Sequence, residues 1–226
     1  MNVLYVTETF LSIQGESSWA GRPSYFIRLS GCNLRCKYCD TTYSFAKGQR
    51  FTIEELVLGL PEGRFYHITI TGGEPLLQGG SVKLMQGLLS LGFEVVLFTN
   101  GTVSLKDVPQ GVKKVVDIKT PWCEAEPPDK VDTEDTPYFA EENFKHLGPD
   151  DEVKFVVRNK EEFIWARQFV QRHDLIHRVG EVIISPELGH TDPLTVWAWM
   201  QETRAPYRLG IQLHKCFYFD KNDRSG

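Results

Sequence analysis

Short apolar stretches rich in β-branched and aromatic residues recur along the chain and alternate with segments of helical periodicity. The first strand is expected at 25–29, where the chain reads Tyr-Phe-Ile-Arg-Leu. Further strands are expected at 66–71, 94–99, 114–119, 153–157, 182–185 and 208–214, and helices at 81–91, 160–172 and 193–201. This alternation predicts an α/β fold built on a mostly parallel sheet.

Two local signals refine the pattern. Thr52-Ile53-Glu54-Glu55 has the form of a capping box and predicts a short helix that ends at Leu60. The stretch 122–151 is rich in Glu, Asp and Pro and predicts a long loop with one acidic helix at 139–147. We find neither an internal repeat nor a linker, so we expect a single domain over 1–226 with a frayed polar tail at 221–226.

Composition narrows the class of protein. The 226 residues are 41% hydrophobic and 24% charged, as in an ordinary globular protein, and contain no apolar run of the ~20 residues that a membrane span needs. The net charge of -5 disfavours a nucleic-acid surface built on general basicity. The first residues lack the basic start and apolar stretch of a secretory signal, and the five cysteines do not suit a disulfide framework. We therefore expect a cytoplasmic protein that binds neither membrane nor nucleic acid.

Three of the cysteines lie close together in a C-x3-C-x2-C pattern, as Cys32, Cys36 and Cys39. Three thiolates on one short loop can hold a 4Fe-4S cluster and leave its fourth iron open to another ligand. A zinc site, or an ordinary ferredoxin-type cluster, stays an alternative if Cys123 or Cys216 supplies a fourth thiolate.

Polar residues follow several of the expected strands. They are Thr71-Gly72-Gly73-Glu74-Pro75, Asn100-Gly101, Asp117-Ile118-Lys119-Thr120 and Ser185-Pro186. The carboxyl ends of parallel strands meet at one edge, where a βα barrel builds its site. The paired glycines would let an extended ligand lie against the backbone, and Glu74 would be aimed from the strand end.

Arg28 stands between two apolar residues of the first expected strand. Its guanidinium either forms a buried salt bridge or offers a fixed fork to a carboxylate.

Together these motifs resemble those of the radical S-adenosylmethionine (SAM) superfamily, including the aromatic Tyr38 just before the last cysteine. Within it, the chain resembles the 7-carboxy-7-deazaguanine synthase family. The matching segments are Ser12-Ile13-Gln14-Gly15-Glu16, Arg28 shortly before Gly31-Cys32-Asn33, Cys39-Asp40-Thr41, and Gln212-Leu213-His214-Lys215.

The resemblance implies a single-domain partial (βα)6-type barrel that carries a 4Fe-4S cluster, SAM and Mg2+. It implies ring contraction of 6-carboxy-5,6,7,8-tetrahydropterin to 7-carboxy-7-deazaguanine with loss of ammonia, in 7-deazapurine (queuosine precursor) biosynthesis. It also implies a homodimer, and an electron donor such as flavodoxin or ferredoxin. No side chain is expected to be catalytic, because the radical forms on the cofactor.

Position by position, the resemblance implies four groups of site residues. The cluster ligands would be Cys32, Cys36 and Cys39, and the Mg2+ ligand would be Thr41. The residues at SAM would be Tyr38, Cys39, Asp40, Gly73, Glu74, Asp117, Lys119, Thr120, Ser185 and Pro186. The residues at the substrate would be Ile13, Gln14, Gly15, Glu16, Arg28, Thr71 and His214, with 1–24 as a substrate-side segment.

The chain departs from the family pattern at Ser17, where glycine is usual, and beyond Lys215, where no match is found. Two other functions are considered. An activase that installs a glycyl radical on a partner protein shares the cysteine loop, but Arg28 with Gln14-Gly15-Glu16 suits a small anionic substrate better. A non-catalytic iron–sulfur or zinc protein would need a fourth ligand such as Cys123 or Cys216.

Overall fold

The computed structural model describes residues 2–63, 66–124, 138–204 and 206–216, without the side chains of His214 and Cys216. One nine-stranded sheet runs through this part of the chain, in the order β3-β1-β2-β4-β5-β6-β7-β8-β9. The strands are β1 (Val3–Ile13), β2 (Pro23–Leu29), β3 (Gln49–Thr52), β4 (His67–Gly72), β5 (Val95–Thr99), β6 (Val112–Asp117), β7 (Glu152–Val157), β8 (Glu181–Pro186) and β9 (Arg208–Leu209).

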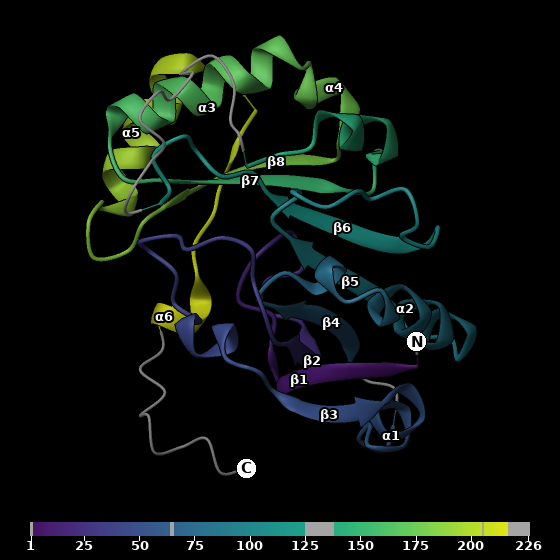
Figure 1. The fold of residues 1–226 in the computed structure, drawn as a ribbon. Coiled ribbons are helices and arrows are strands. Elements are labelled where there is room, and N and C mark those ends of the chain that lie inside the picture. The colour runs from purple at the N-terminus through teal and green to yellow at the C-terminus, as the bar shows by residue number, and fades with distance from the viewer. Residues whose placement is uncertain (1, 64–65, 125–137, 205, 217–226) are drawn as a thin grey trace.

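From β2 to β9 every neighbouring pair of strands is parallel, whereas β1 pairs antiparallel with both β2 and β3. The sheet therefore consists of a parallel series with an antiparallel extension at its N-terminal side. Figure 1 shows it passing from β3 and β1 at the bottom to β7 and β8 at the top, with α1 and α2 on one side and α3, α4 and α5 above. The α/β partial-barrel prediction is confirmed in this arrangement.

The helices begin where the sequence provides caps. The predicted capping box opens α1 (Ile53–Leu58), with Glu55 N donating to Thr52 Oγ1 at 3.1 Å and Thr52 N donating to Glu55 Oε2 at 2.6 Å. Asn159 caps α3 (Lys160–Arg172), and Asp192 caps α5 (Pro193–Thr203), which has proline in its first turn. The other helices are α2 (Gly80–Ser90), α4 (Leu175–Arg178), α6 (Leu213–Cys216) and the 3-10 helices η1 (Thr42–Phe45), η2 (Pro75–Leu77) and η3 (Glu141–His146).

The core lies between the sheet and the helices that cover its outer face. β7 is buried at every position, and Phe155 packs edge-on against Trp165 and Phe169 of α3. Because successive side chains of a strand point to opposite faces, Lys154 lies on the inner face of β7, and its side chain is buried there.

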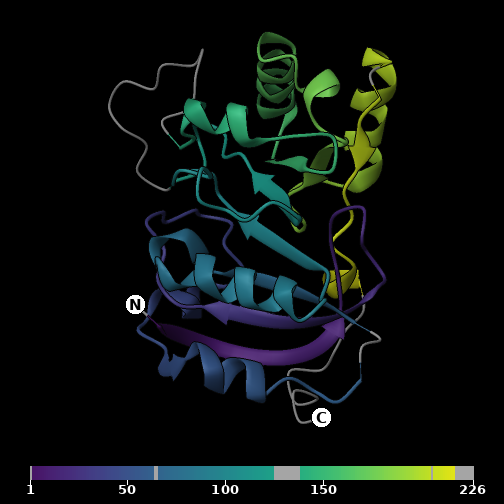
Figure 2. The ribbon, with the colours of Figure 1, turned by 90° about the vertical axis from the view of Figure 1, so that its right-hand side faces the viewer.

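The structure corrects the order or the bounds of three predicted elements. The strand expected at 25–29 is present as β2 but is not the first, because β1 precedes it and pairs with it residue by residue from Glu8 to Ile13. The strand expected at 208–214 ends at Leu209. Gly210 N donates to Ile184 O, and Leu213 N then donates to Gly15 O at 3.0 Å, which turns the chain over the N-terminal loop into α6. Figure 2 shows this C-terminal segment crossing from α5 to α6 beside the loop after β1.

The acidic helix expected at 139–147 is present only as the 3-10 helix η3. Much of the long loop before it, and the tail expected to fray at 221–226, lie outside the described residues. In the part of the chain described here, none of the helices combines the length and apolarity of a membrane span.

Candidate active site at the carboxyl edge of the sheet

The three cysteines lie on the loop that leaves the carboxyl end of β2, and each thiol is partly exposed. The start of this loop is fixed from two sides, because Gly31 N donates to Ser44 O at 2.7 Å and Gly31 O accepts from Glu74 N at 2.8 Å. The cysteine loop is thereby attached to the end of β4. The cysteine loop and the Gly72-Gly73-Glu74 segment therefore meet directly.

The paired glycines allow this attachment. A Cβ atom on Gly73 would lie 2.0 Å from Gly31 O, and one on Gly72, where φ is +139°, would lie 1.9 Å from Leu29 O. The space next to both glycines is filled by the backbone that leads into the cysteine loop. Only residues without a side chain allow β4 to end this close to β2.

Glu74 is turned inward and is fully buried. Its carboxylate accepts hydrogen bonds from Thr99 Oγ1 at 2.8 Å, Asn100 N at 2.7 Å and Leu76 N at 3.0 Å, which tie the ends of β4 and β5 together. Burial raises the pKa of this carboxyl group, and the three donors oppose that rise. Any contact of Gly73 or Glu74 with SAM stays a prediction.

Cys123 lies against the cysteine loop. Its thiol is in hydrogen-bonding contact with Cys36, and Lys37 N donates to Cys123 O at 2.9 Å. That contact, with help from the nearby Lys119, lowers the pKa of Cys36 to about 7, against the effect of burial, and the same contact raises the pKa of Cys123. The contact places Cys123 directly beside one of the predicted cluster ligands.

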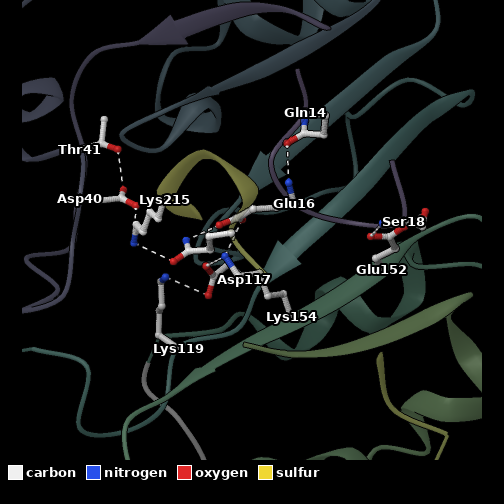
Figure 3. Close-up of polar contacts among 11 residues, drawn as sticks. Gln14, Glu16, Ser18, Asp40, Thr41, Asp117, Lys119, Glu152, Lys154 and Lys215 are labelled. Atoms are coloured by element: carbon white, nitrogen blue, oxygen red, sulfur yellow. Dashed lines mark hydrogen bonds and ion pairs between the residues drawn. The ribbon is translucent and has the colours of Figure 1, made fainter. Parts of the chain in front are cut away.

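Two lysines and two carboxylates form a buried network on the inner face of the sheet (Figure 3). Asp117 at the end of β6 accepts from Lys119 at 2.9 Å and from Lys154 at 3.2 Å, and Lys154 also reaches Glu16 at 2.7 Å. Both lysine pKa values are raised by these carboxylates despite burial, and Lys119 and Lys154 together lower that of Asp117. The network joins the N-terminal loop to β6 and β7.

A cavity of about 130 Å³ opens beside this network, between the N-terminal loop and the C-terminal segment. Its lining includes Glu16, Lys154, Ser185 and Arg208. Ser185 and Pro186 end β8 as predicted, and Thr120 is buried with its hydroxyl 3.4 Å from Glu162.

The C-terminal segment closes over the cysteine loop (Figure 3). Lys215 forms an ion pair with Asp40 at 2.9 Å and donates to Gln212 at 2.7 Å, while Gln212 also donates to Glu16. Thr41 donates to Asp40 at 2.9 Å, so the hydroxyl predicted to bind Mg2+ points toward a carboxylate. The side chain of His214 lies outside the described residues.

The remaining predicted substrate residues line β1, β2 and β4. Ile13 ends β1, and Gln14 donates to Thr69 at 2.9 Å from the buried loop that Gly15 continues. Arg28 is the register partner of Thr71 on the parallel strand β4, and it forms an ion pair with Glu8 of β1 at 2.7 Å.

Ser17, where the resemblance expects glycine, adopts a left-handed backbone with φ of 68°. This is a backbone conformation that favours glycine. A local hydrogen bond stabilises it here, because Trp19 N donates to the Ser17 hydroxyl at 3.0 Å.

Comparison with known proteins decides the family. The radical SAM superfamily matches residues 26–118. A 7-carboxy-7-deazaguanine synthase of Koribacter versatilis is 37% identical over 94% of this chain and 96% of its own length. The chain belongs to the 7-carboxy-7-deazaguanine synthase family.

A second relative in this family, from Chlorobaculum tepidum, is 34% identical over 94% of this chain and 93% of its own length. The crystal structure of QueE from Escherichia coli superposes with a TM-score of 0.69, at 20% identity, over 93% of this chain and 94% of that one. At this identity the superposition supports the shared fold. The chain is accordingly a radical SAM enzyme, and its family implies a 4Fe-4S cluster and SAM.

The residues present fit both groups. Burial raises the pKa of Cys32 and of Cys39, and the nearby Cys36 raises both further, which reflects how close the three thiols lie. Lys119 lies near Cys36 and Cys39 and favours their thiolates. The Tyr38 hydroxyl is buried without a hydrogen-bond partner in the described residues, and the Tyr38 ring faces Lys119 Nζ at 5.2 Å.

The sequence analysis did not single out three residues that contact the predicted site residues in the structure. Lys154 could have been found as a lysine inside an apolar strand, since such a group needs a buried partner. Glu8 and Tyr43 carried no local signal, because their partner Arg28 is distant in sequence.

Proposed function

We propose that this chain catalyses the ring contraction of 6-carboxy-5,6,7,8-tetrahydropterin to 7-carboxy-7-deazaguanine with loss of ammonia. The observation that carries the proposal is Arg28, a guanidinium held on the inner face of β2, the strand that leads into the cysteine loop. The substrate and the product both carry a carboxylate, which a fixed guanidinium binds with two parallel hydrogen bonds. Membership of the family, in which relatives bear this product in their names, supports the same reaction.

The cluster would be held by Cys32, Cys36 and Cys39, and SAM by the backbone and side chains around Tyr38, Asp40 and the strand ends. When bound there, the cluster and SAM together would supply the radical chemistry that the protein side chains lack. The chain itself supplies binding, orientation and exclusion of water.

The substrate would lie between the cysteine loop and the N-terminal loop. Arg28 would bind its carboxylate, and Thr71, the register partner of Arg28 on β4, would contact the ring. Gln14 is already held in place by Thr69, so its backbone and the following Gly15 would line the ring without further rearrangement.

Mg2+ is proposed at Thr41, with Asp40 as a neighbouring carboxylate and substrate oxygens as further ligands. We further propose a homodimer, and a small redox protein of the flavodoxin or ferredoxin type as electron donor. The family resemblance supports both proposals.

Arg28→Lys tests the proposed substrate site. Lysine keeps the charge but loses the planar fork, so the dissociation constant for the carboxylated pterin should rise about 10- to 100-fold, as when a strong charge-assisted contact is lost. Binding would be measured by anaerobic calorimetry on the SAM-loaded enzyme, with iron content as a check of the cluster.

Arg22→Lys is the matched control, because Arg22 pairs with Glu94 at the surface and both side chains are well exposed. It should bind the substrate as the parent does. If Arg28→Lys also bound it as tightly as the parent, the proposed carboxylate site would be wrong.

A further inference from the structure

Arg28 forms the salt bridge that the sequence analysis gave as one alternative, and its partner is Glu8. The Arg28 Nε donates to Glu8 Oε1 at 2.7 Å, and the Tyr43 hydroxyl donates to the same carboxylate oxygen at 2.7 Å. Glu8 and Arg28 are direct register partners on the antiparallel strands β1 and β2, so the sheet itself sets their distance. The Arg28 and Glu8 side chains are only 16% and 29% exposed, which makes this a largely buried pair.

Aromatic rings fix the guanidinium as well. The Arg28 Cζ atom lies 5.7 Å from the centre of the Phe10 ring and 5.9 Å from that of Tyr43, both within the range of a cation–π contact. Phe10 in turn stacks on Phe26, with ring centres 4.8 Å apart and planes 6° from parallel. Arg28 is therefore held by two strands and by the helix η1, which follows the cysteine loop.

The geometry of the guanidinium decides what this arrangement can do. Arg carries five donors in a rigid plane, and the contact with Glu8 uses the Nε side of that plane. A carboxylate takes two donors in parallel, which the pair of Nη groups provides. A side chain that fixes the Nε side thus orients the Nη groups without competing for them.

We propose that Glu8 is a positioning residue for substrate recognition: it fixes Arg28 through Nε, with Tyr43 locking its carboxylate, so that the Nη groups face the substrate carboxylate. This inference rests on the proposed function. Glu8 also neutralises Arg28 while the site is empty, which lowers the cost of keeping a cation in a partly buried place.

The test compares two ligands, 6-carboxytetrahydropterin and the same tetrahydropterin without its carboxylate. Both are titrated by anaerobic calorimetry into SAM-loaded enzyme without reductant, so the readout is binding and not turnover. Glu8→Ala should weaken binding of the carboxylated ligand about tenfold and leave the other ligand unchanged, because only the first uses Arg28. Glu8→Gln, which keeps a neutral acceptor for Nε, should weaken it about threefold.

Coupling between the two residues gives a second readout. In the double variant Glu8→Ala with Arg28→Lys, the effects on the carboxylated ligand should fall well short of additive, because Glu8 acts through Arg28. Should Glu8→Ala fail to fold, the comparison of the two ligands in Glu8→Gln tests the same point.

Four results would overturn the inference. Equal weakening of both ligands in either Glu8 variant would mean a general structural role. Tighter binding of the carboxylated ligand in Glu8→Ala would make Glu8 a competitor of the substrate. If Arg28→Lys weakens binding of both ligands equally or of neither, the proposed function fails and this inference fails with it. If Arg28→Lys weakens only the carboxylated ligand but the Glu8 variants bind both ligands as the parent does, the inference alone is refuted.

Discussion

Gly73→Ala is the substitution that most directly tests how the cysteine loop is held. The added Cβ would lie 2.0 Å from Gly31 O, 2.5 Å from Gly31 C and 2.9 Å from Cys32 N, all backbone atoms that cannot rotate away. The Gly31 carbonyl would have to move by about 1.4 Å to reach the 3.4 Å of ordinary van der Waals contact. Such a shift breaks its hydrogen bond from Glu74 N.

The expected cost follows from two contributions. Overpacking against fixed atoms costs roughly 1–3 kcal/mol, and a buried hydrogen bond left unmade costs roughly 1–3 kcal/mol. We expect the unfolding free energy of the cluster-free protein to fall by about 3 kcal/mol or more, a large part of the roughly 5–15 kcal/mol of a typical domain. Because Gly31 immediately precedes Cys32, iron incorporation on anaerobic reconstitution should fall as well.

Urea unfolding followed by circular dichroism would measure the stability, and iron per chain would measure the site. Gly87→Ala in α2 is the matched control, since a Cβ there meets no atom within 4 Å. It should stabilise the protein by about 0.5–1 kcal/mol, as alanine does inside a helix. A Gly73→Ala protein with parental stability and full iron content would refute the steric reasoning.

Three further predictions concern other groups. Cys123→Ala combined with Cys216→Ala should leave iron and sulfide content unchanged after reconstitution, whereas a site with a fourth cysteine ligand would lose its metal. Lys154→Gln removes the buried cation that pairs with both Glu16 and Asp117 and should lower the unfolding free energy by about 3 kcal/mol. The exposed Lys160→Gln should change it by less than about 0.5 kcal/mol, and similar losses in both variants would contradict the buried network. Burial lowers the pKa of His67 to about 4, so the unfolded chain takes up the proton first and stability should fall by up to about 3 kcal/mol as pH drops from 6.5 towards 4. In His67→Phe the loss of stability between pH 6.5 and 4 should be smaller by this amount. The same pH dependence of stability in the variant and the parent would contradict the role of His67.

Local signals in the sequence predicted the helices and the parallel strands well. The bounds of α3 match because Asn159 provides a cap and the apolar spacing is helical throughout. The polar strand ends meet at one edge because parallel strands force them to do so.

What the sequence did not predict depends on long-range pairing. The partner of Lys154 is Glu16, 138 residues away, and no local pattern connects them. β1 shows alternation that favours a strand, but only its antiparallel register reveals that Glu8 lies opposite Arg28. The glycines at the end of β4 were interpreted as a surface for an extended ligand, and that interpretation stays a prediction. Their second role, the close approach of β2 to β4, depends on strand pairing that no local pattern reveals.

The proposed reaction is tested most directly by an anaerobic assay of the reconstituted protein with SAM, dithionite, Mg2+ and 6-carboxytetrahydropterin, followed by mass spectrometry. We predict that 7-carboxy-7-deazaguanine forms without matching accumulation of 5′-deoxyadenosine, as expected if SAM is regenerated. Deoxyadenosine without that product would keep the radical chemistry and refute the proposed substrate. The absence of both from a protein with a fully loaded cluster would contradict the proposed function as a whole.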